Sequence, residues 1–346
     1  MLTNSAPTRT THTASTVSPV RRLSMLKPTG HLTLGNYLGA LRGMAAEQHH
    51  ATCFFGIADL HALTVPHEPG RLRDLVHETA TILLAAGLDP DHATLFVQSQ
   101  VPAHSELSYL LESTVYTGEL NRMIQFKEKG RDRPSTRASL YTYPTLMAAD
   151  ILLYRASEVP VGDDQRQHVE LTRDLATRFN RTYGQVFTVP QITTPASGAR
   201  VMDLQDPTTK MGKSHANGAG IIYLLDGAAV VLRKISRAVT DSDSGPDAVR
   251  HDPATKPGVS NLLEIIAACQ GDEPHRVAAG LTSYGDLKEH ATEAVVQVLG
   301  PIQARYAALT DDNELVARIY AEGAERCRSE TAPVLNAARQ AMGLVS

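Results

Sequence analysis

The sequence lacks the features that mark a membrane protein, a zinc protein or a disulfide-stabilised domain. Its 346 residues include no tryptophan and three cysteines, Cys53, Cys269 and Cys327, which lie far apart and form no CxxC pair. This spacing predicts neither a zinc site nor a disulfide framework, and it fits a reducing compartment. No apolar run reaches the roughly 18 residues that a membrane-spanning helix needs, so we expect no membrane segment.

The first 20 residues lack what a secretory signal requires. They are rich in serine and threonine and contain neither an acidic residue nor an apolar segment. This composition predicts a disordered extension over residues 1–20 rather than a signal peptide. A transit peptide shares the lack of acidic residues, but the amphipathic arginine-rich helix of such peptides is missing too. We therefore expect a cytoplasmic protein.

An excess of positive charge is also missing. The formal net charge is −4, which is not typical of a general nucleic-acid binder and argues against DNA as a partner. Any contact with RNA must be local. Two basic clusters are candidates, and each fits a solvated surface equally well. The first lies within residues 122–137 and includes Lys127, Lys129, Arg131 and Arg133, and the second comprises Arg233, Lys234 and Arg237.

The chain is long enough, and at 42% hydrophobic residues apolar enough, to form two domains. Short apolar runs that alternate with helix-like segments predict a doubly wound parallel sheet of the Rossmann-like α/β class. We expect strands at 23–26, 52–57, 93–98 and 158–161, and helices at 37–46, 70–86 and 165–179. Because such sheets bind ligands where their strands end, the loops after these strands are expected to converge on one pocket.

The rest of the pattern is helical. Residues 105–153 are helix-like around a polar interruption at 127–139, and further helices are expected at 222–239, 261–269, 287–299 and 315–342. The predicted organisation is a catalytic domain over 21–205 with a helical insertion at about 105–155. A lysine loop and an all-helical second domain follow over 206–318. A last helix over 319–346 is expected to pack back on the first domain.

One glycine-containing segment, Lys27 to Asn36, lies between the first expected strand and the first expected helix. A strand that restarts as a helix after a Pro-x-Gly break brings backbone N–H groups and a helix dipole to one point, where an anion can be held. Its spacing matches neither the dinucleotide fingerprint nor the P-loop. Gly35 leaves room for a ligand close to the backbone, while Thr33 and Asn36 offer polar groups. Alone, the segment is equally compatible with an ordinary loop.

A second segment, Lys210-Met211-Gly212-Lys213-Ser214, follows Asp206-Pro207. Two lysines three residues apart on a glycine-containing loop form a mobile cationic clamp, which suits the charge that develops on a leaving pyrophosphate. Taken alone, it could also be a solvated basic loop.

Together the two segments resemble the HIGH and KMSKS signatures of class I aminoacyl-tRNA synthetases. Thr33-Leu34-Gly35-Asn36 stands in the first place and Lys210 to Ser214 in the second. The sequence between them is similar to that of bacterial-type tryptophanyl-tRNA synthetases. That similarity is carried by Val159 to Gln165, Gln167-His168, Glu170 to Asp174, and Tyr143-Pro144 running into Met147 to Asp150. The resemblance runs from about Ser24 to the end of the chain.

The resemblance implies that ATP activates tryptophan with release of pyrophosphate, and that the aminoacyl group then passes to tRNA(Trp). It implies a homodimer, and Mg²⁺ bound with ATP on phosphate oxygens and water, because no carboxylate cage is visible and no metal ligands are predicted. The expected catalytic residues are Thr33, Asn36, Lys210, Lys213 and Ser214. The expected ATP-binding residues are Lys27, Pro28, Thr29, Gly30, Gly35, Asn36, Gly162, Asp164, Gln165, Val201, Lys210, Met211 and Lys213.

Asp150 carries the amino-acid preference in this interpretation. The resemblance implies that its carboxylate accepts a hydrogen bond from the indole N–H, which is a donor only. The alternative is a helix N-cap or a surface acid. The remaining expected tryptophan contacts are Met147, Tyr143, His61, Val159, Val161 and Gln165, of which the apolar ones are equally credible as core.

Two departures from the family pattern matter. Lys27 stands where glutamine is common, and Gly212 where serine is typical. A cation at the lip of the pocket suggests the hypothesis of an auxiliary enzyme that tolerates tryptophan-mimicking inhibitors. Three rival interpretations remain: a tyrosyl-tRNA synthetase, a phosphopantetheine-type adenylyltransferase, and a catalytically inactive RNA-binding paralogue.

Overall fold

The computed structural model describes residues 20–130, 133–193, 200–212, 218–245 and 247–345, without the side chains of Asp163 and Asp164. The predictions for residues 1–19, Lys213 and Ser214 therefore lie outside the described residues. Within the described ranges, no helix combines the length and the apolar character needed to cross a membrane.

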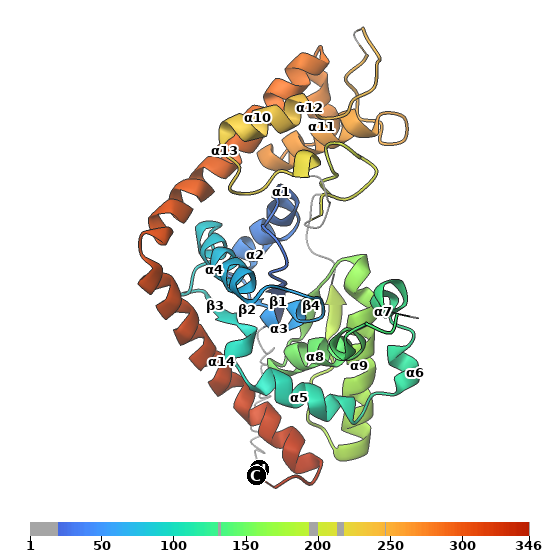
Figure 1. The fold of residues 1–346 in the computed structure, drawn as a ribbon, viewed down its shortest axis with the longest axis vertical. Coiled ribbons are helices and arrows are strands. Elements are labelled where there is room, and N and C mark those ends of the chain that lie inside the picture. Colours follow the sequence, from blue (N-terminus) through green and yellow to red (C-terminus); the bar gives the residue numbers. More distant parts are fainter. Residues whose placement is uncertain (1–19, 131–132, 194–199, 213–217, 246, 346) are drawn as a thin grey trace, which may run out of the picture.

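A five-stranded parallel sheet forms the centre of the molecule, in the order β3-β2-β1-β4-β5 (Figure 1). Side chains alternate between its faces, since Phe55 of β2 belongs to one hydrophobic cluster and Phe54 to the other. This alternation with both faces covered confirms the predicted doubly wound α/β class. The strands are β1 (Arg21–Leu26), β2 (Thr52–Ile57), β3 (Ala93–Val97), β4 (Glu158–Pro160) and β5 (Gln191–Thr193).

Helices cover both faces of the sheet. On one face, the π-helix Tyr37–Leu41 and α4 (Pro69–Ala85) pack on the strands, and on the other face lie α5 (Ala103–Glu112), α8 (Ala138–Leu153) and α9 (Asp163–Tyr183). The shorter helices of this part are α1 (Leu34–Asn36), α2 (Arg42–Glu47), α3 (Asp59–Ala62), the 3₁₀ helix Gln98–Gln100, α6 (Thr117–Leu120) and α7 (Ile124–Lys129).

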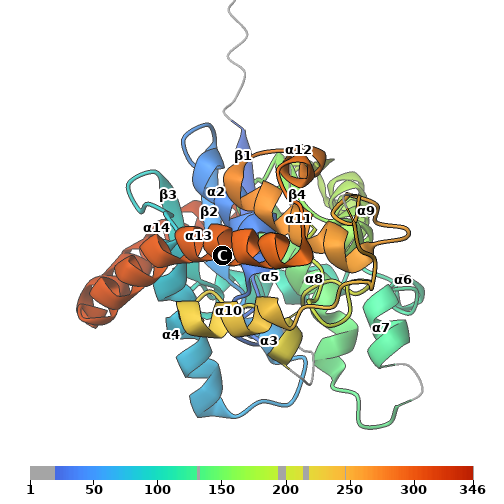
Figure 2. The ribbon, with the colours of Figure 1, turned by 90° about the horizontal axis from the view of Figure 1, so that it is seen from above.

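The remaining chain is mostly helical. Its first helices lie over one end of the sheet, and its last helix runs along the side of the sheet (Figures 1 and 2). It contains the 3₁₀ helix Gly218–Gly220, α10 (Ala228–Ser236), α11 (Pro257–Gln270), α12 (Pro274–Ala279), α13 (Tyr284–Thr310) and α14 (Asn313–Ala341). One hydrophobic cluster holds Phe55 of the sheet together with Leu263 and Val295 of these helices. The helical part and the sheet therefore share a core, and α13 and α14 run along both (Figure 1).

Three expectations are corrected. The helix expected at 222–239 is shortened to α10, because residues 222–224 pair with the Leu32–Leu34 segment through Leu34 N to Ile222 O and Leu224 N to Leu32 O. The interruption at 127–139 begins later, because α7 continues to Lys129. The strand β5 was not expected, since three residues are too few for a periodic pattern.

The last long helix, α14, lies against the edge strand β3 at an unusually short distance. A Cβ atom on Gly323 would stand 1.8 Å from the carbonyl oxygen of Leu95, so only glycine fits at this contact. Covering an edge strand with a helix removes a site where another chain could pair. The close approach thus fixes α14, and with it the end of α13, against the sheet.

We expect Gly323→Ala to lower the free energy of unfolding by about 1–3 kcal/mol, because the added methyl group forces α14 away from β3. Gly300→Ala is the matched control, since Gly300 lies in α13 with nothing within 4 Å of its added Cβ. The control should gain roughly 0.5–1 kcal/mol from reduced backbone entropy. Urea unfolding of both variants measures the difference, and equal effects would show that the contact does not matter.

Candidate active site

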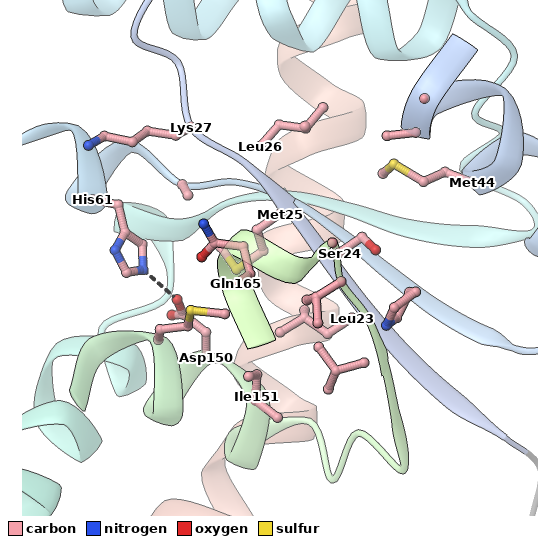
Figure 3. A pocket seen from close by; sticks show the side chains of 18 of the residues that line it. Leu23, Ser24, Met25, Leu26, Lys27, Met44, His61, Asp150, Ile151 and Gln165 are labelled. Atoms are coloured by element: carbon pink, nitrogen blue, oxygen red, sulfur yellow. Dashed lines mark hydrogen bonds and ion pairs between the residues drawn. The ribbon is translucent and has the colours of Figure 1, made fainter. Parts of the chain in front are cut away.

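A cavity of about 900 Å³ opens where β1 and β4 separate. The two strands pair only at Arg22 and Glu158, and beyond that point β1 continues while β4 turns into the Gly162 loop. This is the place where the strand order reverses, because β2 follows β1 on one side and β4 lies on the other. Ligands of doubly wound sheets bind at such a crevice. Figure 3 shows the cavity with β1 and the following Lys27 along it.

Asp150 lies at the base of the cavity and is almost completely buried. Its Oδ1 accepts hydrogen bonds from Gln98 Nε2 at 2.7 Å and from His104 Nδ1 at 2.6 Å, and its Oδ2 is 2.8 Å from His61 Nε2 (Figure 3 shows the contact with His61). Burial raises the pKa of Asp150, but the hydrogen bonds from His104 and His61 outweigh it and hold the pKa below its usual range. The site therefore contains a buried anion that accepts hydrogen bonds.

The walls beside Asp150 are aromatic and apolar. Tyr143 presents its ring at a 76° angle to His61, with ring centroids 6.1 Å apart, and its hydroxyl group contacts His168. Burial raises the pKa of Tyr143, so its hydroxyl stays neutral. Met147 and Val159 complete this side of the cavity. The space is shaped for a flat apolar ligand with a polar edge.

Two lysines line the same cavity. Lys27 donates from Nζ at 2.9 Å to Thr64 Oγ1, which in turn donates to the carbonyl oxygen of His61. Lys129 of α7 is held by Gln125 Oε1 at 2.5 Å. Burial, and then the charge of Lys129, lower the pKa of Lys27. The cavity thus contains a buried anion and two cationic side chains.

The HIGH-like segment is built as a reciprocal helix cap. Asn36 N donates to Thr33 Oγ1 at 3.3 Å, and Thr33 N donates back to Asn36 Oδ1 at 3.0 Å. Thr33 is fully buried, and its hydroxyl also bonds Asn36 Oδ1. The two side chains fix the start of α1, so the polar groups offered by the sequence are partly occupied with each other.

The two signature segments, about 175 residues apart in the sequence, meet in space. A Cβ on Gly35 would lie 3.6 Å from both Val201 Cβ and the carbonyl oxygen of Met211. Met211 N donates to Val201 O at 3.0 Å, and Lys210 is exposed beside them. The lysine loop therefore begins directly on the glycine of the first segment.

The sequence-predicted residues fall into four groups. Those lining the cavity are Lys27, Thr29, His61, Tyr143, Met147, Asp150, Val159, Val161, Gly162 and Gln165. Those at or beside the meeting point of the signature segments are Thr33, Gly35, Asn36, Val201, Lys210 and Met211. Pro28 and Gly30 lie in the sequence between β1 and Thr33. Lys213, Ser214 and the side chain of Asp164 lie outside the described residues. The described part of the chain contains no group of three or more side chains that could hold a metal ion.

Sequence reasoning missed four residues of the site: Gln98, His104, Thr64 and, as a cavity residue, Lys129. Gln98 directly follows β3, so the rule that functional side chains follow parallel strands would have found it. His104 and Thr64 carried no local signal. The packing of α5 against α8 places His104 behind Asp150, and Thr64, two residues past α3, lines the cavity beside Lys27.

The ionised form of Asp150 should stabilise the fold in a pH-dependent way. Because its folded-state pKa is lowered, this stability is present above the usual carboxyl pKa of about 3.9 and is lost as the pH falls through the folded-state value. We expect Asp150→Asn to cost about 1–3 kcal/mol near neutral pH, and the deficit to shrink below about pH 4. Urea unfolding at several pH values tests this, and a deficit that does not change with pH would contradict it.

Comparison with known proteins agrees with this geometry. The family model described as class I tRNA synthetases (W and Y) matches residues 16–300. Tryptophan–tRNA ligase 1 of Streptomyces coelicolor is 54% identical over 330 residues, covering 94% of this chain and 97% of the relative. The tryptophan–tRNA ligase of Halalkalibacterium halodurans is 46% identical over 323 residues, covering 93% and 97%.

Solved structures show the same relationship. Tryptophanyl-tRNA synthetase from Mycoplasma pneumoniae superposes with a TM-score of 0.86 at 36% identity, covering 95% of this chain and 99% of that one. The Campylobacter jejuni enzyme, complexed with ADP and tryptophan, gives 0.81 at 30% identity, covering 94% and 100%. The tyrosyl-tRNA synthetase from Archaeoglobus fulgidus gives 0.65 at 18% identity, which shows a shared fold. The chain therefore belongs to the class I aminoacyl-tRNA synthetases, in the family of the bacterial tryptophan–tRNA ligases.

Proposed function

We propose that this protein is an ATP-dependent tryptophan–tRNA ligase, which forms tryptophanyl-adenylate with release of pyrophosphate and then transfers the aminoacyl group to tRNA(Trp). The observation that carries the proposal is the buried Asp150 carboxylate at the base of an apolar cavity. An indole N–H can only donate a hydrogen bond and an ionised carboxylate can only accept one. A site built this way rejects side chains that leave the carboxylate unpaired.

The proposed tryptophan site uses the residues around Asp150. Met147, Val159 and Val161 supply apolar surface for the indole ring, and Tyr143 and His61 supply aromatic edges. Gln165, at the start of α9, is proposed to meet the polar end of the amino acid. A tyrosine substrate would need polar groups set for a phenol hydroxyl, which both donates and accepts, and the donors His61 and His104 keep Asp150 an acceptor.

The proposed ATP site lies at the carboxyl end of β1. There Gly35 leaves space beside Met211, while the N–H groups of Leu34 and Asn36 are already bonded to Ile222 O and to Thr33. Pro28, Thr29 and Gly30 form the loop that leads to it. Gly162, Asp164 and Val201 are proposed to border the nucleotide, and the lysines of the signature loop, Lys210 and Lys213, to reach its phosphates together with Ser214.

In the proposed mechanism, the protein positions the two substrates and supplies positive charge. As the tryptophan carboxylate attacks the α-phosphorus, charge grows on the leaving pyrophosphate, which needs in-line placement and cationic groups more than covalent help. Lys27 and Lys129, which line the cavity, support this role. Mg²⁺ bound with ATP would neutralise further phosphate charge, held mainly by phosphate oxygens and water.

The partners are proposed at the level that the family suggests. A homodimer and a cytoplasmic location are expected for such an enzyme, and the helical part from 206 to 318 is the proposed anticodon-binding domain.

The residues of the second basic cluster, Arg233, Lys234 and Arg237, differ as candidate RNA contacts. Lys234 is engaged with Asp226 at 2.6 Å and with a backbone carbonyl, whereas Arg233 and Arg237 are exposed. The exposed pair is therefore the better candidate in that cluster.

We expect exchange of pyrophosphate into ATP with tryptophan and with none of the other 19 standard amino acids. Asp150→Asn should lose most of this exchange through a higher KM for tryptophan, because the indole N–H loses its charged acceptor. Exchange with tyrosine would assign the tyrosyl specificity instead. No exchange with any amino acid would indicate a paralogue without catalysis, and a pantetheine adenylyltransferase would give the same result.

The hypothesis of an inhibitor-tolerant, auxiliary enzyme rests on Lys27. An indole-based inhibitor that covers this ammonium group removes water from a cation that is already partly buried, which costs binding free energy. Lys27→Gln should therefore lower the concentration of an indole-based inhibitor that halves the exchange rate, while the KM for tryptophan serves as the internal control. Unchanged sensitivity in this variant would remove the hypothesis.

A further inference from the structure

A chain of buried polar side chains runs from the base of the cavity into the molecule. His104 Nδ1 lies 2.6 Å from Asp150 Oδ1, and His104 Nε2 lies 2.9 Å from the hydroxyl oxygen of Tyr154. Cys327 of α14 lies in the same buried cluster as Tyr154. His104, Tyr154 and Cys327 are each fully buried. Asp150 and Tyr154, from α8 and its C-cap, and His104, from α5, thus form a hydrogen-bonded chain that leads away from the cavity.

The direction of each hydrogen bond follows from the chemistry of the groups. Ionised Asp150 can only accept, so His104 Nδ1 must carry a proton and donate it. In a neutral imidazole the other nitrogen is then an acceptor, so the Tyr154 hydroxyl donates to Nε2. Burial raises the pKa of the nearby Cys327 thiol to about 12, so Cys327 stays neutral and adds no charge beside Tyr154.

The acceptor positions of Asp150 can be counted in the same way. A carboxylate offers about four lone-pair positions, two on each oxygen. Gln98 Nε2 and His104 Nδ1 both donate to Oδ1, and His61 Nε2 lies at Oδ2. Among the described residues, one position on Oδ2 therefore remains for a ligand. The carboxylate is turned so that its filled oxygen faces the protein and the other faces His61 at the cavity.

The His104 ring has little freedom to move. It stacks on Phe96, with ring centroids 5.8 Å apart at an angle of 17°, and its other neighbour is Tyr154 at 5.6 Å. Both ring nitrogens are hydrogen-bonded as well. A ring held on its faces and at both nitrogens can fix the rotation of the carboxylate that it contacts.

We propose that His104 is a positioning residue for tryptophan: held as the Nδ1–H tautomer by the Tyr154 hydroxyl group, it turns Asp150 so that one carboxylate position is offered to the indole N–H. The proposal rests on the proposed function, because it assigns a role in recognising the same substrate. His104 itself lies behind Asp150, away from the residues that line the cavity.

The first test compares two substitutions of His104 in ATP–pyrophosphate exchange. His104→Leu removes the donor, and we expect the KM for tryptophan to rise about 10- to 100-fold, as for a lost hydrogen bond to a charged group. The KM for ATP should stay near the wild-type value. His104→Asn places an amide N–H close to the position of Nδ1 and should restore most of the tryptophan affinity. A merely structural role would not separate the two substrates or respond to this rescue.

The second test uses a matched pair of tyrosines. Tyr154→Phe removes the donor to His104 Nε2, and we expect the ¹⁵N resonance of Nε2 to leave the range of a hydrogen-bonded acceptor and the KM for tryptophan to rise roughly two- to tenfold. Tyr320 on α14 is buried to a similar extent and donates to Ala80 O at 3.2 Å, far from His104 in sequence and contact. Tyr320→Phe should leave both readings unchanged.

The outcomes separate the two proposals. A folded His104→Leu variant with an unchanged KM for tryptophan, or an unprotonated Nδ1 in the wild-type protein, would overturn the positioning role. If His104→Leu does not fold, the asparagine and Tyr154 variants decide in its place. Absence of tryptophan-dependent exchange in the wild-type protein would instead refute the proposed function. The ¹⁵N measurement of the His104 tautomer needs no substrate and would still test that part of the inference separately.

Discussion

The structure depends on keeping one carboxylate ionised out of water. Removing an unpaired charge from water costs many kcal/mol, and a carboxylate is tolerated inside a protein only when several donors reach it. The donors to Asp150 come from three separate elements: Gln98 after β3, His61 in α3 and His104 in α5. Each of these elements must be in place for the charge to be stable. The ionised Asp150 of the cavity therefore depends on the same arrangement of elements that forms the fold around the sheet.

A second constraint joins the sheet to the helical part. The hydrophobic cluster that begins under the HIGH-like segment at Leu34 continues through Ile222 to Leu263 and Val295. Backbone hydrogen bonds between the Leu32–Leu34 segment and Ile222–Leu224 place the chain just beyond the lysine loop against the start of α1. Gly323 lets α14 approach β3 closely, which fixes α14 and the end of α13 against the sheet. The loop that carries Lys210 thus starts from a rigid base.

The cavity contains charges of both signs, and the proposed chemistry uses both. Asp150 at the base suits a ligand that donates a hydrogen bond from an apolar ring. Lys27 and Lys129 suit a polyanion, and burial, followed by the charge of Lys129, lowers the pKa of Lys27. A crevice that binds both a hydrogen-bond donor and a polyanion brings the amino acid and the nucleotide together for reaction.

The sequence by itself determined the features that repeat or that follow a fixed local rule. The alternation of apolar runs and helices predicted the doubly wound sheet. The signature segments, together with the sequence around Asp150 and Gly162, indicated the family. Most of the residues that this resemblance assigned to tryptophan line the cavity. Local patterns carry this information because strand and helix periods and turn residues act over a few positions.

Only the tertiary structure decided which polar side chains hold Asp150, where the helix expected at 222–239 begins, and that Lys129 faces the cavity. His61 and Asp150 are separated by 89 residues, and no local pattern connects them. Residues 222–224 leave the helix because pairing with the Leu32–Leu34 segment satisfies their backbone groups. The three-residue strand β5 exists because β4 offers it an edge. Each of these outcomes depends on contacts between distant segments, whose free energy exceeds the weak preferences of the local sequence.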